Sequence, residues 1–111
     1  MDMVNRYDIY WVDLNPVVGS EISKVRPAVV ISPDELNHHL KTVIIAPLTS
    51  TIRNYPFRLK VMVADKMGEI ALDQLRCIDK SRLKSKLSSL SSEKCKAIQD
   101  LLHCLFEELV I

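Results

Sequence analysis

Residues 27–32 read PAVVIS, a short and continuous apolar run. A strand with one wet face would alternate apolar and polar residues, so an unbroken run is typical of a strand buried on both faces. Pro33 follows the run and ends it, because proline cannot donate a ladder hydrogen bond. The run therefore predicts a short strand that other elements cover from both sides.

Strands are also predicted before and after this run. Tyr7–Leu14 is rich in aromatic and β-branched residues, and Pro16 follows shortly after it. Thr42–Leu48 predicts a third strand that kinks or leaves the ladder at Pro47. In residues 57–63 (FRLKVMV) apolar side chains recur at every second position, which predicts a half-buried strand with one wet face.

The segments between these strands carry weaker signals. Two more short strands, or one bent strand, are expected in Glu69–Leu72 and Leu75–Ile78. Residues 83–90 are rich in serine and lysine and stay unassigned. The other connections are a loop at Val17–Val25, a helical turn at Asp34–Asn37, a polar loop at Thr49–Pro56 and a turn at Lys66–Gly68.

The last stretch has a different period. From Cys95 to Leu109 apolar residues fall at helical spacing, with polar residues on the other side. Ser91 or Ser92 is the expected N-cap, and Glu93 suits the positive end of the helix dipole. The sequence predicts an α+β fold in one domain over residues 1–111, a small antiparallel β-barrel or curled sheet followed by an amphipathic C-terminal helix.

Composition narrows the functional classes. The 111 residues are 48% hydrophobic, which argues against disorder, and carry a net charge of +1. The positive charge is concentrated in residues 53–86, with nine Lys/Arg against four Asp/Glu, and it ends in the run KSRLKSK at 80–86. This run is either a phosphate-binding strip or an ordinary solvated face.

The cysteines and the N-terminus give further expectations. Cys77, Cys95 and Cys104 are odd in number and lack CxxC spacing, so neither a disulfide framework nor a zinc site is predicted. We expect no metal and no cofactor. Reduced thiols and the lack of a signal peptide or an apolar run of membrane-spanning length favour a cytoplasmic protein without a membrane partner.

Common catalytic motifs are missing. The chain has no GxGxxG, Walker loop, HExxH or GxSxG. A ribonuclease can use two histidines as acid and base, but His38 and His39 are loop neighbours that would point apart, and His103 falls on the polar side of the helix. A histidine pair is therefore not the expected catalytic device.

Three polar segments interrupt the strand pattern. In the first, the loop residues Gly19, Ser20 and Glu21 precede Arg26, whose planar guanidinium suits a phosphate or pairs structurally with Glu21 or Asp13. The other two are the hydroxyl cluster Thr49-Ser50-Thr51, which binds phosphate oxygens or serves a turn, and Asp73-Gln74, where Gln74 reads a base edge or bonds backbone.

Taken together, these segments resemble the MazF/PemK family of toxin–antitoxin systems over residues 7–87. The matching elements occur in family order and at family-like separations. They are Asp13-x-x-Pro16-x-x-Gly19-Ser20-Glu21, Arg26–Ser32, Pro47-x-Thr49-Ser50, Tyr55-Pro56-Phe57 and Asp73-Gln74-Leu75-Arg76-x-Ile78-Asp79. One departure is the loop segment Ile22–Val25, which is often glycine-rich in the family.

The resemblance implies an SH3-like barrel with a C-terminal helix, a twofold homodimer, and sequence-selective cleavage of single-stranded RNA. It implies an antitoxin partner whose disordered tail covers the RNA groove, and operator DNA contact only through that complex. It places the catalytic arginine on Arg26 and the catalytic threonine on Thr49. Substrate contacts fall on Gly19, Ser20, Glu21, Ser50 and Gln74.

The implied reaction is a metal-independent transesterification, in which the ribose 2′-OH attacks the adjacent phosphorus and leaves 2′,3′-cyclic phosphate and 5′-OH ends. Glu21 is a candidate for accepting the 2′-OH proton.

Two alternative functions stay open. One is a gyrase-binding toxin like CcdB, whose action depends on a tryptophan near its C-terminus. This alternative is disfavoured here, because the only tryptophan in the chain is Trp11. The other is a barrel that binds RNA or a partner without catalysis.

Overall fold

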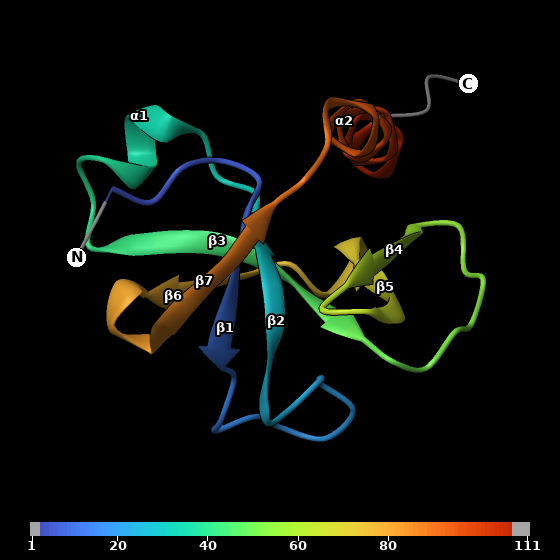
Figure 1. The fold of residues 1–111 in the computed structure, drawn as a ribbon, viewed down its shortest axis with the longest axis horizontal. Helices are drawn as coiled ribbons and strands as arrows, with labels where there is room; N and C mark the ends of the chain where they lie inside the picture. The colour runs from blue at the N-terminus through green and yellow to red at the C-terminus, as the bar shows by residue number, and fades with distance from the viewer. Residues whose placement is uncertain (1–2, 108–111) are drawn as a thin grey trace.

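The computed structural model of the chain describes residues 3–107. It contains strands, two α-helices and two 3-10 turns, labelled in chain order (Figure 1). The strands are β1 (Asp8–Asp13), β2 (Val25–Val30), β3 (Thr42–Thr49), β4 (Arg58–Val63), β5 (Lys66–Ala71), β6 (Arg76–Asp79) and β7 (Leu83–Ser89). The helices are α1 (Asp34–Asn37) and α2 (Ser92–Phe106), and the 3-10 turns are η1 (Leu72–Gln74) and η2 (Lys80–Arg82).

All strand pairings are antiparallel, in the order β4-β5-β3-β2-β1-β7, with β6 also paired to β3. The sheet curls on itself, and α2 follows it at the C-terminal end (Figure 1). The α+β prediction of a curled antiparallel sheet with a C-terminal helix is confirmed. Among the described residues no helix is long and apolar enough to cross a membrane.

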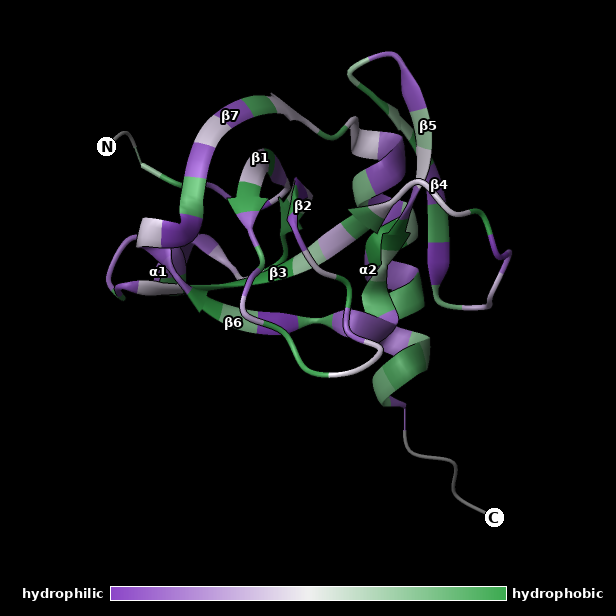
Figure 2. Ribbon diagram, turned by 90° about the horizontal axis from the view of Figure 1, so that it is seen from below, coloured by the Kyte–Doolittle hydropathy of each residue, from purple (hydrophilic) through white to green (hydrophobic). Residues whose placement is uncertain are grey.

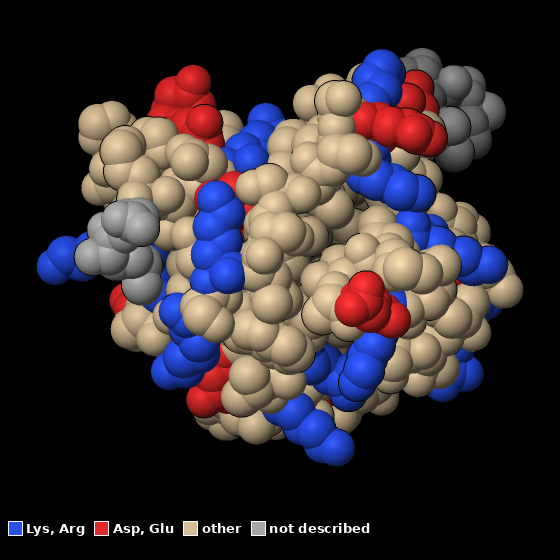
Figure 3. All heavy atoms as spheres, viewed as in Figure 1, with Lys and Arg blue, Asp and Glu red and all other residues tan. Residues whose placement is uncertain are grey.

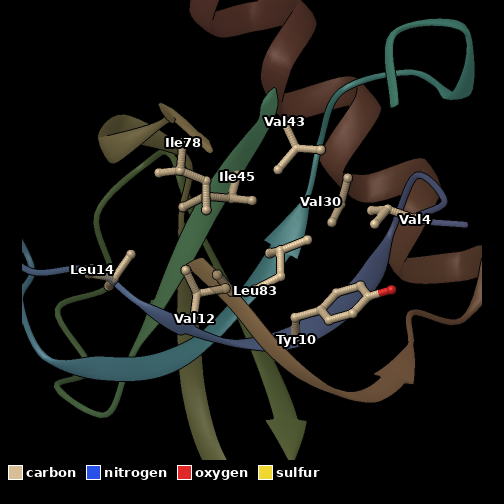
Figure 4. Close-up of a cluster of buried hydrophobic side chains, with 10 residues drawn as sticks. Val4, Tyr10, Val12, Leu14, Val30, Val43, Ile45, Ile78 and Leu83 are labelled. Carbon is tan, nitrogen blue, oxygen red and sulfur yellow. The ribbon is translucent and has the colours of Figure 1, made fainter. Parts of the chain in front are cut away.

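The PAVVIS run contributes its first four residues to β2, which ends at Val30 and not at Ser32, and the strand has the two buried faces that its composition predicts. Ala28, Val29 and Val30 are each 0% exposed. Ala28 and Val30 contribute to a cluster inside the curl, where Val12 and Leu83 also point (Figure 4). Val29 belongs to a second cluster on the other face. Two cores therefore hold β2 in place, and with it the residues at its N-terminal end.

The second cluster is closed by α2. Ile98 of this helix is 0% exposed and packs among residues of β2, β4 and β5, and Figure 2 shows the helix lying beside β4. Ser91 is the N-cap, since its side chain accepts a hydrogen bond from the Lys94 amide at 3.3 Å. The amphipathic helix prediction is confirmed to Phe106, while Leu109 lies outside the described residues.

Two of the segments between the strands differ from the prediction. Lys66–Gly68 is not a turn but part of β5, and the chain reverses at Ala64 and Asp65, whose φ angles are +51° and +61°. Neither residue is the glycine or asparagine that usually marks such a turn. The unassigned segment forms β7, which pairs with β1.

Pro47 does not end its strand. It pairs with Ala28 of β2, and β3 continues to Thr49. On its other edge, β3 pairs with β6 from Thr42 to Ile45 and with β5 at Leu48 and Thr49. Pro47 lies at this change of neighbour, so the strand leaves one ladder without leaving the sheet.

The cysteines are free thiols, as their number and spacing predict. Cys77 and Cys104 are exposed, and Cys95 is half-buried. Burial raises the pKa of the Cys95 thiol above its usual range.

Candidate active site

Three adjoining hollows lie where the loop after β1, the end of β3 and η1 meet. Their volumes are about 470, 390 and 270 Å³. Ser20 and Gln74 line the first two, Glu21 lines the first, and Thr49 lines the second and third. Arg26 and Ser50 line the third with Thr49. Six of the seven predicted site residues thus border one continuous region, and Gly19 lies beside them in the loop with φ +58°.

Arg26 is positioned by β2, where it pairs with Val12 of β1. Its Nε donates to the carbonyl oxygen of Ser23 at 2.7 Å, which fixes the plane of the guanidinium. Within residues 3–107 it forms no ion pair with Glu21 or Asp13, the structural partners that its position allowed. Its two terminal nitrogens are therefore left for a ligand in the third hollow.

Thr49 is the last residue of β3 and is only 8% exposed. Its Oγ1 accepts a hydrogen bond from the Thr51 amide at 3.2 Å. The hydroxyl hydrogen is therefore available to donate. Thr49 therefore serves the turn, and its role in binding phosphate oxygens stays a prediction.

The loop between β1 and β2 is held by side chains. A Glu21 carboxylate oxygen accepts from the Val18 amide at 2.6 Å, and the Gln74 carbonyl oxygen accepts from the Ile22 amide at 2.8 Å. Ile22 packs against the core inside the curl. Ile22 belongs to the segment that is often glycine-rich in the family, and here its side chain anchors the loop to the core. Gln74 realises its structural role through its carbonyl oxygen, and its NH₂ group stays available to a ligand.

The second of the three hollows, the middle hollow, is also lined by residues outside the predicted site set, and no sequence signal indicated Arg53 and Arg58. Besides the predicted residues it is lined by Ile22, Thr51, Arg53, Tyr55 and Arg58. Arg58 is engaged within the protein, because its Nε and Nη2 donate to the two Asp73 carboxylate oxygens at 2.6 and 3.0 Å. The hydrogen bond from Arg58 lowers the pKa of Asp73, and the same bond raises the pKa of Arg58.

Residues 5–106 match the sequence profile of the PemK-like, MazF-like toxins of type II toxin–antitoxin systems. The chain belongs to this family. It is 39% identical over 104 residues to the endoribonuclease MazF of Staphylococcus saprophyticus, a match that covers 88% of this chain and 87% of that protein.

Solved MazF structures share the fold of this family member. MazF of Deinococcus radiodurans superposes with a TM-score of 0.83 at 24% identity, covering 95% of this chain and 97% of that one. A mycobacterial endoribonuclease, solved with its cognate antitoxin, gives 0.80 at 21% identity, covering 96% and 99%. The MazE–MazF complex of D. radiodurans gives 0.76 at 25% identity, covering 95% and 96%.

The basic run at 80–86 of this PemK/MazF-family chain is mostly engaged within the protein. Lys80 donates to the carbonyl oxygen of Asn37, and Lys86 lies 3.4 Å from a carboxylate oxygen of Asp8. Arg82 donates to the carbonyl oxygens of Asp13 and Asn15. Figure 3 shows positive and negative side chains interspersed over one face. A phosphate-binding strip along this run is therefore not supported.

The histidines of this family member stand apart from the site. His38 contacts the side-chain oxygen of Asn5 at 3.0 Å, and none of the three lines the hollows described above. Residues 3–107 contain no group of three or more His, Cys, Asp or Glu side chains arranged to hold a metal ion.

Proposed function

We propose that this chain is the endoribonuclease toxin of a type II toxin–antitoxin system and cleaves single-stranded RNA at selected sequences without a metal ion. The observation that carries the proposal is the pairing of Arg26 and Thr49 on one hollow, each with unused hydrogen-bond donors. Family membership and the 39% identity to an endoribonuclease MazF support the same activity.

In the proposed reaction the ribose 2′-oxygen attacks the adjacent phosphorus, and the bond to the 5′-oxygen breaks. No metal is needed to generate the nucleophile, because the substrate carries it. Negative charge grows on the phosphoryl oxygens in the transition state. A preorganised donor aimed at that charge is worth about 2.7–4 kcal/mol. Arg26 supplies that donor, and Thr49 holds a phosphoryl oxygen or positions the 2′-OH.

Proton transfer needs a second group. Arginine has a pKa above about 12 and is a poor base at neutral pH. Two carboxylates line the first hollow, and Asp73 is held by Arg58, which leaves Glu21 as the candidate base. One of its oxygens is used by the Val18 amide, and we assign the other to the 2′-OH proton. The departing 5′-oxygen takes its proton from solvent, so the products are a 2′,3′-cyclic phosphate and a 5′-OH.

The proposed partners follow from the family. The toxin acts as a homodimer, and an antitoxin inhibits it by laying an extended segment over the same hollows. Two of the similar structures contain the toxin with its antitoxin. Contact with operator DNA is proposed only through the antitoxin complex.

The test is cleavage of a long, mixed-sequence single-stranded RNA by the purified protein in excess EDTA. Discrete fragments with cyclic-phosphate ends are expected. Arg26→Ala removes the charge-stabilising donor and should slow cleavage by about 10²-fold or more. Lys41→Ala, an exposed substitution just before β3, is the matched control and should cleave as wild type does.

Two outcomes would count against this function. Cleavage by folded Arg26→Ala at the wild-type rate would remove Arg26 from the mechanism. Intact RNA after incubation with the folded wild-type protein, free of antitoxin, would favour a gyrase-binding or binding-only barrel instead.

A further inference from the structure

Glu69 places a carboxylate in the interior of the protein. The residue is 0% exposed and lies in β5, where it pairs with Thr49 of β3. Burying a carboxylate is far more costly than burying an apolar side chain unless partners replace its water. A valine or leucine would satisfy this strand position without that cost. The partners of the Glu69 carboxylate therefore indicate what the charge is for.

Two of these partners are backbone amides of the loop between β3 and β4. Glu69 Oε1 accepts from the Arg53 amide at 2.9 Å, and Oε2 accepts from the Asn54 amide at 3.0 Å. Asn54 has φ +57°, a conformation that needs support. The Thr51 amide donates to Thr49 Oγ1. The first half of this loop is thus tied to the sheet by two side chains, those of Thr49 and Glu69.

The third partner connects Glu69 to the opposite wall of the middle hollow. Arg58 Nη1 lies 3.9 Å from Glu69 Oε1, and the same guanidinium holds Asp73 in a two-point contact. Asp73 precedes Gln74 in η1, and Gln74 holds the Ile22 amide of the first loop. Glu69 therefore holds one loop directly, and it reaches the other through Arg58, Asp73 and the next residue along the chain, Gln74.

We propose that Glu69 is a positioning residue for RNA binding. Its carboxylate holds the 50–57 loop, which contributes Thr51, Arg53 and Tyr55 to the hollow, in the conformation that receives the substrate. Through Arg58 and Asp73 it also fixes η1 and Gln74. Glu69 does not touch the RNA. The inference rests on the proposed ribonuclease function.

Glu69→Gln is the direct test, because the amide keeps the size but offers one acceptor where the carboxylate offers two. One loop amide loses its partner, and the loop becomes ordered only when RNA binds. We expect KM for a short RNA with a single cut site to rise about tenfold while kcat changes by less than about threefold. Thr49→Ala should show the opposite split, with a lower kcat. Glu35→Gln, an exposed substitution in α1, is the matched control.

A purely structural role would lower the denaturation midpoint of Glu69→Gln and leave KM unchanged in the folded protein. That result would overturn the proposal. Unaltered KM together with an unaltered midpoint would overturn it as well.

A second measurement on the wild-type protein covers the case in which the variant does not fold. Amide hydrogen exchange should show Arg53 and Asn54 protected by about tenfold or more, although both lie in an exposed loop. Unprotected amides would overturn the inference whether or not the protein cleaves RNA. A protein with protected amides and no ribonuclease activity would contradict the proposed function and leave the loop-holding role of Glu69 standing.

Discussion

At the scale of single residues, the absence of a side chain at Gly68 sets how closely β5 approaches Thr49. A Cβ atom at this position would lie 2.9 Å from the Thr49 carbonyl oxygen. Gly68→Ala must therefore push the two strands apart next to the candidate catalytic threonine. We expect it to lower the free energy of unfolding by about 1–3 kcal/mol, and to slow RNA cleavage. Urea denaturation and cleavage assays check the two effects.

The control for the stability measurement is Gly19→Ala. A Cβ there meets no atom within 4 Å, so its cost comes from the positive φ alone and leaves Thr49 in place. Equal stability of Gly68→Ala and the wild type would show that β5 accommodates the added methyl group.

At the scale of elements, α2 depends on its N-cap. The Ser91 side chain accepts from the Lys94 amide, while Ser92 is already the first helical residue. Ser91→Ala should lower the free energy of unfolding by about 1 kcal/mol, because one amide of the first turn loses its partner. Ser92→Ala should have a much smaller effect. Thermal or urea denaturation measures both, and equal losses would contradict the capping role.

Elements with a strong period were predictable from the sequence, and those without one were not. The continuous PAVVIS run and the 3.6-residue spacing after Ser91 each decide a structure locally. The turn at Ala64-Asp65 carries no glycine, so the Met67-Gly68 pair was the more persuasive signal. β7 was missed because this strand exposes most of its polar side chains and buries mainly Leu83.

The candidate site shows the same division. Arg26 and Thr49 lie at strand ends, where a motif in the sequence marks them. Glu69, Arg58 and Asp73 are brought together by the pairing of β4 with β5 and by the η1 turn. No spacing along the chain shows that a glutamate in an apolar strand faces two loop amides, so this network could be found only in three dimensions.

At the scale of the whole molecule, the described surface keeps large apolar side chains in contact with water. They include Val18, Met62 and Met67, which are 81%, 65% and 50% exposed. A domain of this size buries a modest fraction of its surface, so association is a natural way to cover more. We expect the purified toxin to be a dimer. Sedimentation equilibrium should give twice the chain mass, and a single-chain mass at concentrations that support cleavage would contradict the homodimer.

The internal ties of Arg58, Arg82, Lys80 and Lys86 have a consequence for how this protein would meet a polyelectrolyte. Each of these cations has a carboxylate or carbonyl partner, so the cations that line the hollows with terminal nitrogens still to offer are mainly Arg26, Arg53 and Lys66. Three phosphate contacts on a single strand release few counterions, about 0.7 each. Affinity for RNA would then fall only gently with ionic strength. Discrimination among sequences would rest on uncharged groups, as suits a toxin that must ignore most of the nucleic acid around it.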